Sequence, residues 1–214
     1  MKSIVDLTSK FRIGTPKAFR NLTVFPLLDG AAVADYLTLD EALAQRSATI
    51  TEVGEGGSVR QLAFVNSGPK PVLLLDGEEL LGAKQNRVLN LTILAPAERT
   101  TIIPVSCVEA GRWRHTSATF SSAPRAQYAE GRAKKMMHVS ESMKHGSRAS
   151  DQGEVWRDID LKFGKFGLHS PTAAMSDLYE AETVPVEDFV NAFSVEDDQF
   201  GAMFAVEGAL FGFD

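Results

Sequence analysis

The sequence predicts an α+β fold with a β-rich N-terminal half, either a sandwich or a partial barrel. Short alternating apolar runs separated by turn residues fill the chain up to about residue 121 and predict strands. Good helix formers dominate from about residue 123 to residue 193 and predict a helical middle. Two apolar runs joined by Glu207 and Gly208 predict a C-terminal β-hairpin.

The strands of the first half follow from apolar runs bounded by turn residues. Residues 22–28 form one strand, in which Pro26 favours an edge position or a bulge. Residues 48–53 and 59–65 alternate on either side of the turn at 54–57 and predict a hairpin. Further strands are expected at 72–75, 88–94 and 101–105. A run of short strands at this spacing favours a sandwich or partial barrel over alternating strand–helix units.

Helices are marked by caps and by apolar spacing. Thr38 and Glu41 have the spacing of a capping box, which predicts a short helix through about residue 45. Pro124 suits a first helical turn, and residues 126–145 are rich in helix formers. Residues 151–163 place apolar side chains on one helical face. Shorter helices are expected at 171–181, opened by Ser170 as cap, and at 186–193.

The chain is expected to form one domain over residues 1–214. Its length suffices for a sizeable core, and no repeat or low-complexity linker divides it. The apolar hairpin at 202–213 ends one residue before the chain does. Either this hairpin docks into the main sheet, or the natural protein continues and the chain is truncated relative to its family.

Composition limits the cellular setting. The chain is 44% hydrophobic and 23% charged, which are ordinary globular values. It has no apolar run of eighteen residues, and its first fourteen residues lack the apolar block of a signal peptide. The expected location is the cytoplasm, without membrane contact. The single cysteine, Cys107, agrees with a reducing compartment and excludes a multi-cysteine zinc site.

Charge is unevenly distributed along the chain. A formal net charge of −6 disfavours a nucleic-acid partner. Residues 124–148 nevertheless carry six basic and two acidic side chains, whereas residues 177–214 carry ten acidic and no basic ones. The simpler interpretation is a basic helix near an acidic tail of the same fold. A phosphate-binding or RNA-binding stripe is the alternative.

Polar side chains are concentrated between residues 76 and 113, among runs that should be buried. An unpaired buried polar group costs roughly 1–3 kcal/mol, so these groups need partners. Two interpretations stay open, a ligand site and a structural network in which Arg87 pairs with Glu78 or Glu109. If residues 84–87 form a strand, their side chains alternate between its two faces. The candidate ligand-binding residues are Lys84, Gln85, Asn86, Arg87, Arg112 and Trp113.

The candidate catalytic residues are Cys107, Glu78 and Glu109. Cys107 would act as a nucleophile only beside a histidine or a cation, and His115 and Arg112 are close in sequence. Its other interpretation is a small buried hydrophobic residue. Glu78 and Glu109 would form an acid/base pair or would bind a hard cation whose shell water completes. Arginines and amides are typical groups for phosphate and base edges, and Trp113 either stacks on a ligand ring or belongs to the core.

Several familiar motifs are excluded by spacing. Residues 77–84 approach a phosphate-binding loop, but Lys84 comes one position late and Gln85 replaces the Ser or Thr that holds magnesium. The four histidines lack the spacing of zinc ligands. We therefore expect no metal site, and the sequence identifies no cofactor.

Five segments, residues 21–27, 76–78, 82–87, 104–109 and 111–113, resemble the ARG and rhodanese-phosphatase-superfamily-associated protein domain family, called ARPP-1-like. The resemblance spans most of the chain. It implies genomic association with ADP-ribosylglycohydrolases and rhodanese-phosphatases, and hence proximity to NAD and ADP-ribose metabolism. It also implies that family members continue beyond a hairpin like the one at 201–212. No reaction and no catalytic residues carry over from it.

The leading hypothesis is a domain that binds a phosphorylated or nucleotide-derived small molecule. In this hypothesis the domain also hydrolyses the molecule or transfers a group from it. In it, Glu78 or Glu109 is the general base, and Arg87 and Arg112 hold anionic oxygens. Whether the chain is an enzyme stays open. The alternative is a non-catalytic module that assembles with a second copy or with a partner enzyme, through the basic helix or an exposed sheet edge.

Overall fold

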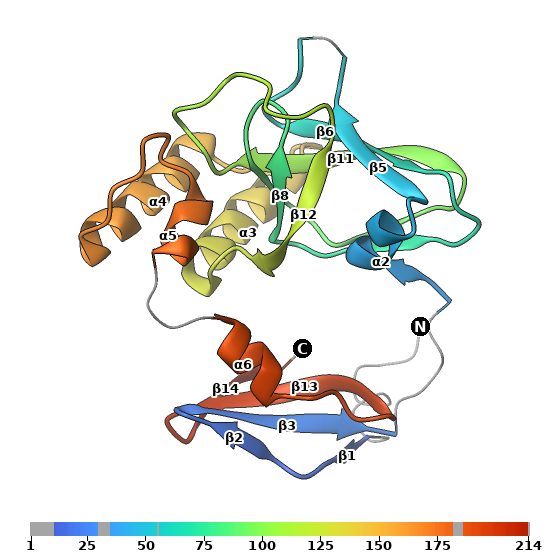
Figure 1. Ribbon diagram of the computed structural model, residues 1–214, viewed down its shortest axis with the longest axis vertical. Helices are drawn as coiled ribbons and strands as arrows, with labels where there is room; N and C mark the ends of the chain where they lie inside the picture. Colours follow the sequence, from blue (N-terminus) through green and yellow to red (C-terminus); the bar gives the residue numbers. More distant parts are fainter. Residues whose placement is uncertain (1–10, 30–34, 55, 182–185, 214) are drawn as a thin grey trace. The chain divides into compact units, whose positions relative to one another are not determined.

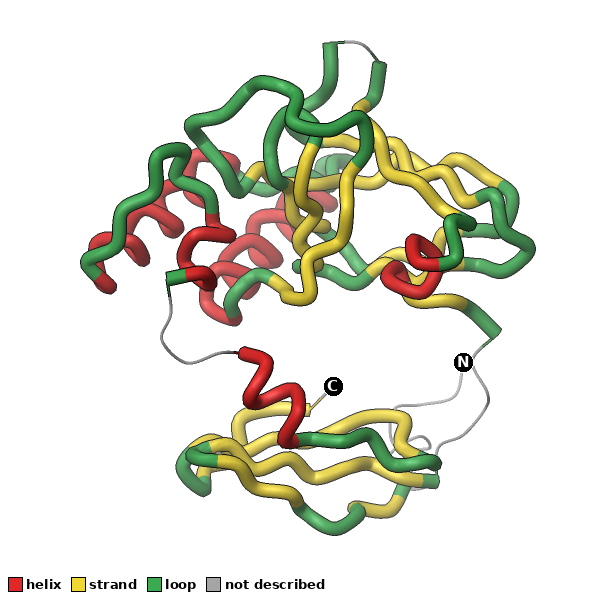
Figure 2. The backbone as a smooth tube through the Cα atoms, in the orientation of Figure 1, coloured by secondary structure: helices red, strands yellow, loops and turns green. Residues whose placement is uncertain are grey.

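The computed structural model describes residues 11–29, 35–54, 56–181 and 186–213 (Figures 1 and 2). The first ten residues, on which the absence of a signal peptide partly rests, lie outside these ranges. The chain divides into two compact units, one formed by residues 1–34 and 182–214 and the other by residues 35–181. The expected single domain over residues 1–214 stays a prediction, which the number of unfolding transitions tests.

The first unit is a β-sheet joined by one helix. Its strands are β1 (Arg12–Ile13), β2 (Lys17–Phe19), β3 (Leu22–Leu28), β13 (Gln199–Val206) and β14 (Ala209–Phe213), and its helix is α6 (Val186–Ala192). The sheet order is β1-β3-β13-β14, with β2 also paired to β3. The predicted C-terminal hairpin is confirmed, and it docks on β3 with Met203 opposite Phe25.

Pro26 was expected at an edge position or at a bulge, and the edge position is wrong because β3 is flanked on both sides. On one side β3 pairs with β13 over its whole length. On the other side its partner changes from β2, opposite Val24, to β1, opposite Leu27. Pro26 falls in this gap, where its missing N–H disrupts no ladder, and its carbonyl accepts a hydrogen bond from the Gly14 N–H at 2.8 Å.

The second unit contains two sheets. Their strands are β4 (Leu37–Thr38), β5 (Ala48–Glu52), β6 (Gln61–Asn66), β7 (Val72–Leu74), β8 (Glu78–Gly82), β9 (Arg87–Leu89), β10 (Ile93–Ala95), β11 (Arg99–Cys107) and β12 (Phe120–Ala126). Six strands form an antiparallel sheet in the order β12-β8-β9-β11-β6-β5, and three form β10-β7-β4. The edge strands β12 and β5 approach each other, so the larger sheet curls into a partial barrel, one of the two predicted architectures (Figure 1).

The main hydrophobic core fills the inside of this partial barrel. Helix α2 (Leu39–Ala44) closes it with the buried side chains of Leu39 and Ala42, and the predicted capping box between Thr38 and Glu41 is confirmed. The other core side chains come from alternate positions of the strands, as a half-buried sheet requires. They are Ala48, Ile50, Leu62, Phe64, Val72, Leu74, Leu80, Ala83, Leu89, Ala95, Ile103, Val105 and Phe120.

A second hydrophobic cluster lies between the sheet and the helices α3 (Ala129–Met143), α4 (Gln152–Phe166) and α5 (Met175–Glu180). Helix α4 begins after Asp151, whose carboxylate accepts the Glu154 N–H at 3.1 Å. Its predicted apolar face is confirmed, because Val155, Ile159 and Phe163 are buried there. They pack with Val88, Val108, Met175 and Leu178.

The helical region begins at Ala129, later than the predicted residue 123. Pro124 lies in β12 rather than in a first helical turn. β12 is an edge strand whose pairing with β8 is interrupted between Ser122 and Ala126, so the missing N–H of Pro124 is tolerated there. Within the described residues no helix is both long and apolar enough to cross a membrane.

Candidate functional site

The candidate site is organised by the turn between β8 and β9. Residues 84–87 do not form one strand, the case considered in the sequence, because β8 ends at Gly82 and β9 begins at Arg87. Gly82 has φ +120°, and a Cβ at this position would lie 2.5 Å from the Ser117 hydroxyl. Because the chain turns here, Gln85, Asn86 and Arg87 contact one polar cluster instead of alternating across a sheet.

Arg87 lies on the inner face of the partial barrel, at the end of the main core. It stands opposite Cys107 on β11, and its guanidinium is 0% exposed. Nη1 donates to the main-chain oxygen of Gln85 at 2.9 Å and to Gln85 Oε1 at 3.2 Å. Nε and Nη2 have no hydrogen-bond acceptor in the described part of the chain. The nearest carboxylate oxygen, Glu52 Oε1, is 3.9 Å from Nη2.

Burial lowers the pKa of Arg87, although the neighbouring Cys107 and Glu52 oppose that effect. A guanidinium remains protonated at neutral pH even so. Arg87 is therefore a buried cation with two donor nitrogens that have no acceptor among the described residues. Burying such donors without an acceptor destabilises the fold, and a hydrogen bond to an anionic oxygen would offset that loss.

Trp113 and Lys84 lie beside this cation at the surface. The Trp113 ring centroid is 5.7 Å from Arg87 Cζ and 5.3 Å from Lys84 Nζ, and the residue is 48% exposed. The Lys84 ammonium also donates to the Gly56 carbonyl in the turn between β5 and β6. We call Arg87, Lys84, Trp113 and Glu52 the Arg87–Trp113 face. It combines two cations with a half-exposed aromatic ring.

Arg112 and Glu109 form a closely paired group next to it. Arg112 Nε lies 2.8 Å from Glu109 Oε1, and Nη2 lies 2.6 Å from Oε2. Arg112 Nη1 donates to the Ala83 carbonyl at 2.7 Å and to Thr116 Oγ1 at 3.0 Å. Asn86 joins both partners, since its N–H donates to Glu109 Oε2 and its Oδ1 accepts from Arg112 Nη2. Arg112 and Glu109 thus brace the turn that carries Arg87.

Glu109 is held as a carboxylate. Burial raises its pKa, but hydrogen bonds from Arg112, Asn86 and Thr172 outweigh burial and leave the pKa below its ordinary value. Both carboxylate oxygens already accept hydrogen bonds. This arrangement favours a supporting role for Glu109 over that of a general base.

Cys107 is fully buried and lies between Gln85 and Glu109. Its Sγ is 3.1 Å from Gln85 Oε1 and 3.3 Å from the Glu109 carbonyl oxygen. Burial raises the pKa of Cys107, with the nearby Arg87 charge acting in the opposite direction. The thiol is therefore neutral at physiological pH, which disfavours nucleophilic attack. The ring of His115, which the sequence suggested as a partner for this thiol, contacts the Ser117 carbonyl instead.

Glu78 makes its hydrogen bond away from the polar cluster of Gln85, Asn86 and Arg87. Its Oε2 accepts the Leu75 N–H at 2.9 Å, and burial raises its pKa. The neighbouring Glu79 is the fully buried carboxylate of β8, and it pairs with Arg125 Nε at 2.8 Å. The structure brings together Gln85, Asn86, Arg87, Cys107, Glu109 and Arg112, with Lys84 and Trp113 at the surface beside them.

Two buried charged residues were missed in the sequence, one inside the cluster and one outside it. Glu52 enters the cluster from the end of β5, and its Oε1 accepts the Lys84 N–H at 3.3 Å. The signal for it is a carboxylate directly before a glycine-rich turn. Lys135, on α3, is buried and donates to Asp76 and to the Leu89 carbonyl. In the sequence it is indistinguishable from its solvated neighbours. Among the described residues no group of three His, Cys, Asp or Glu side chains is arranged to hold a metal ion.

The relationship to known proteins agrees with the resemblance of the motifs. Residues 10–214 match ARPP-1, the ARG and Rhodanese-Phosphatase-superfamily-associated Protein domain. No match is found among curated proteins or among solved structures. The family match covers essentially the whole chain and includes every residue of the polar cluster. The chain therefore belongs to the ARPP-1 domain family.

Proposed function

We propose that the second unit binds a phosphate-bearing small molecule at the Arg87–Trp113 face. The observation that carries this proposal is the pair of unused donors on the buried guanidinium of Arg87. Arginine is suited to phosphate because its planar donors match two oxygens at once. Lys84 adds a second cation beside the same ring.

A ligand reaches Arg87 when the Trp113 side chain moves. The indole ring is half exposed and is next to the guanidinium, so a change of its rotamer uncovers the cation. The same ring then stacks on a base or another flat group of the ligand. Phosphate contact and stacking together favour a nucleotide-derived molecule over a simple phosphate.

The family name narrows the ligands to test first. It associates the domain with the rhodanese-phosphatase superfamily, and the resemblance of the motifs adds ADP-ribosylglycohydrolases. NAD and ADP-ribose contain phosphates, ribose and an aromatic base, which are the groups that the Arg87–Trp113 face suits. The buried thiol of Cys107 supports a reducing, cytoplasmic setting for this binding.

Binding stands ahead of catalysis in this proposal. The Glu109 carboxylate is occupied by Arg112 and Asn86, and Cys107 is a neutral buried thiol. Both residues position the turn that carries Arg87. Hydrolysis or group transfer would need a group that the bound ligand itself brings into place.

The test is a thermal-shift titration with NAD, ADP-ribose, AMP and inorganic phosphate. A ligand that binds only the native state raises the melting temperature with concentration. We expect a shift with a nucleotide, its loss in Arg87→Met and Trp113→Ala, and its retention in Arg114→Ala, an exposed neighbour. If none of these ligands shifts the melting temperature, the proposal is overturned. Water would then be the acceptor for the Arg87 donors.

The second candidate is a non-catalytic interaction module. The observation that favours it is one apolar side chain of α3, Met137, which is 71% exposed. Such a side chain is suited to a protein interface. Sedimentation of the wild type and of Met137→Glu tests it, because this substitution dissociates an assembly formed through α3.

A further inference from the structure

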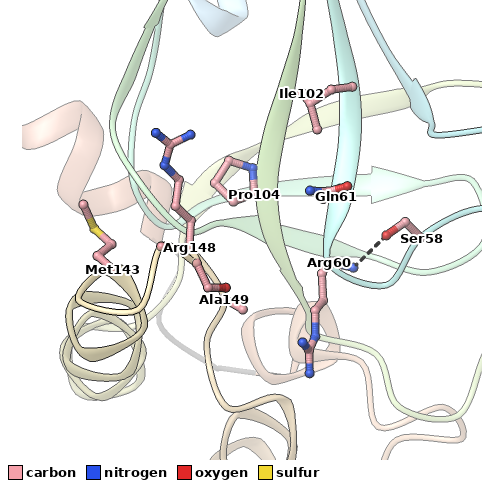
Figure 3. Close-up of a pocket in the computed structure, with 10 residues that line it drawn as sticks. Ser58, Arg60, Gln61, Ile102, Pro104, Met143, Arg148 and Ala149 are labelled. Atoms are coloured by element: carbon pink, nitrogen blue, oxygen red, sulfur yellow. Dashed lines mark hydrogen bonds between the residues drawn. The ribbon is translucent and has the colours of Figure 1, made fainter.

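The second unit contains a groove that the polar cluster does not use. It lies between strands β6 and β11 and the connection from α3 to α4, and its volume is about 720 Å³ (Figure 3). This size is within the range of small-molecule sites. The lining residues are Ser58, Arg60, Gln61, Ile102, Pro104, Met143, Gly146, Ser147, Arg148 and Ala149. None of them belongs to the Arg87–Trp113 face.

The connection that forms one wall is fixed to the sheet. Asn90 Nδ2 donates to the Arg148 carbonyl at 3.0 Å, and the hydroxyl oxygens of Ser106 and Ser150 lie 2.5 Å apart. The Gln152 side chain makes two hydrogen bonds with the main chain of Cys107: its Oε1 accepts from the N–H at 2.8 Å, and its Nε2 donates to the carbonyl at 2.7 Å. The groove is therefore largely preformed, which lowers the entropic cost of binding.

The groove is electropositive. Arg60 and Arg148 are exposed, and in the described part of the chain neither guanidinium has a hydrogen bond or an ion pair. No acidic residue is among the lining residues. Some other exposed cations of the unit, such as Lys70 and Arg157, do pair with carboxylates. In Figure 3 the two guanidinium groups point in different directions, that of Arg60 from the residue before β6 and that of Arg148 from the connection, so these exposed side chains must turn to contact one anion.

Apolar side chains supply another part of the lining. Ile102 is 46% exposed and Met143 is 49% exposed, and both line the groove together with Pro104. A purely ionic ligand such as phosphate would leave this apolar surface in water. A molecule with an apolar body would bury it and gain roughly 25 cal/mol for each Å².

We propose that this groove binds an amphipathic small-molecule anion, with an apolar or aromatic body and a phosphate, sulfonate or carboxylate group. Arg60 and Arg148 contact the anionic part, and Ile102 and Met143 contact the body. Ser58 and Ser147 offer hydroxyl groups for further hydrogen bonds. This site is independent of the Arg87–Trp113 face, so either proposal can fail without the other.

The test uses 8-anilinonaphthalene-1-sulfonate, a fluorescent amphipathic anion, titrated into the wild type and single variants. We expect saturable binding to the wild type and roughly fivefold weaker binding for Arg60→Ala and for Arg148→Ala. The double variant should lose tenfold or more in affinity. Arg99→Ala is the matched control, because Arg99 is an exposed arginine of β11 that does not line the groove. Its binding should equal that of the wild type.

Competition identifies the chemistry of the ligand. Octyl phosphate and octanoate should both displace the probe, and the ratio of their affinities shows whether the groove prefers phosphate or carboxylate. Inorganic phosphate should displace the probe poorly. Met143→Gln should weaken the binding of the probe without changing the melting temperature of the protein. Equal binding by the wild type and the double variant would overturn the proposal. Displacement by inorganic phosphate as effective as by octyl phosphate, or stronger displacement by single-stranded RNA, would also overturn it.

Discussion

The Arg112 end and the Arg87 end of the buried polar cluster differ in how completely their charges are paired. Arg112 makes a two-point contact with Glu109 and reaches a carbonyl and a hydroxyl besides. Arg87 is the more deeply buried of the two, yet two of its three nitrogens lack acceptors in the described part of the chain. Residue type alone therefore does not fix the role of a buried arginine; its partners do.

The contrast separates two roles that a buried polar cluster can have. A structural network satisfies its members, because each unsatisfied donor destabilises the fold. A binding site leaves donors directed at a ligand and accepts that cost. Arg112 fits the first description and Arg87 the second. The comparison also explains why the turn at 83–86 is braced by Arg112, since an unpaired cation needs a rigid support.

The largest effect is expected from Arg112→Met. This change leaves the Glu109 carboxylate buried without its cation, and breaking such a pair costs about 3–5 kcal/mol. The free energy of unfolding from urea titration measures the loss. Arg114→Met, at the exposed neighbour, should stay within about 0.5 kcal/mol of the wild type. A loss as small as that of the control would mean that Glu109 finds other partners and that Arg112 does not brace the turn.

A smaller loss is expected from Arg87→Met. Methionine keeps much of the volume and removes two unused donors, so the change should cost about 1–2 kcal/mol. The same urea titration compares it directly with Arg112→Met. If Arg87→Met is as destabilising as Arg112→Met, Arg87 is a structural residue and the contrast between the two ends disappears.

Much of the fold follows from local sequence. The capping box at Thr38, the apolar face of α4 and the hairpin at the C-terminus were predicted from spacing alone and are confirmed. Pro124 was misassigned because proline suits both a first helical turn and an interrupted edge strand. Only the pairing of β12 with β8, formed by segments about forty residues apart, decides between them.

The membership of the site was predicted better than its geometry. Gln85, Arg87, Cys107 and Arg112 do lie together, because a polar run between buried strands has few places to go. Glu78 was favoured over Glu79, and the structure places both at the start of β8. Which one is buried depends on the face that meets Arg125, a residue of another strand.

Acid titration sharpens the comparison at Glu109. Its folded-state pKa lies below the ordinary 4.5, so its contribution to stability is complete above that value and is lost as the pH falls through the folded pKa. The difference in unfolding free energy between the wild type and Glu109→Gln should shrink below pH 4.5. One proton changes this difference by at most about 1.4 kcal/mol per pH unit.

Glu79 provides the control of opposite sign. Burial raises its pKa above 4.5, despite the hydrogen bond from Arg125, so its carboxylate opposes folding at neutral pH. That opposition is relieved as the pH falls toward 4.5. As the pH falls from neutral toward 4.5, the wild type should therefore gain stability relative to Glu79→Gln. As the pH falls further, below 4.5, it should lose stability relative to Glu109→Gln. Equal slopes for both variants would show that the two carboxylates share one environment.

The smallest change in stability is expected from Trp113→Ala. The ring is half exposed, and its contacts with Arg87 and Lys84 contribute about 0.5–1 kcal/mol each when they are solvated. A total loss of about 1 kcal/mol, together with loss of the nucleotide-induced thermal shift, would assign the ring to ligand contact. A loss comparable to that of Arg112→Met would instead make Trp113 a core residue. The Arg87 end would then be closed by packing, because a ring that the fold depends on cannot move aside for a ligand.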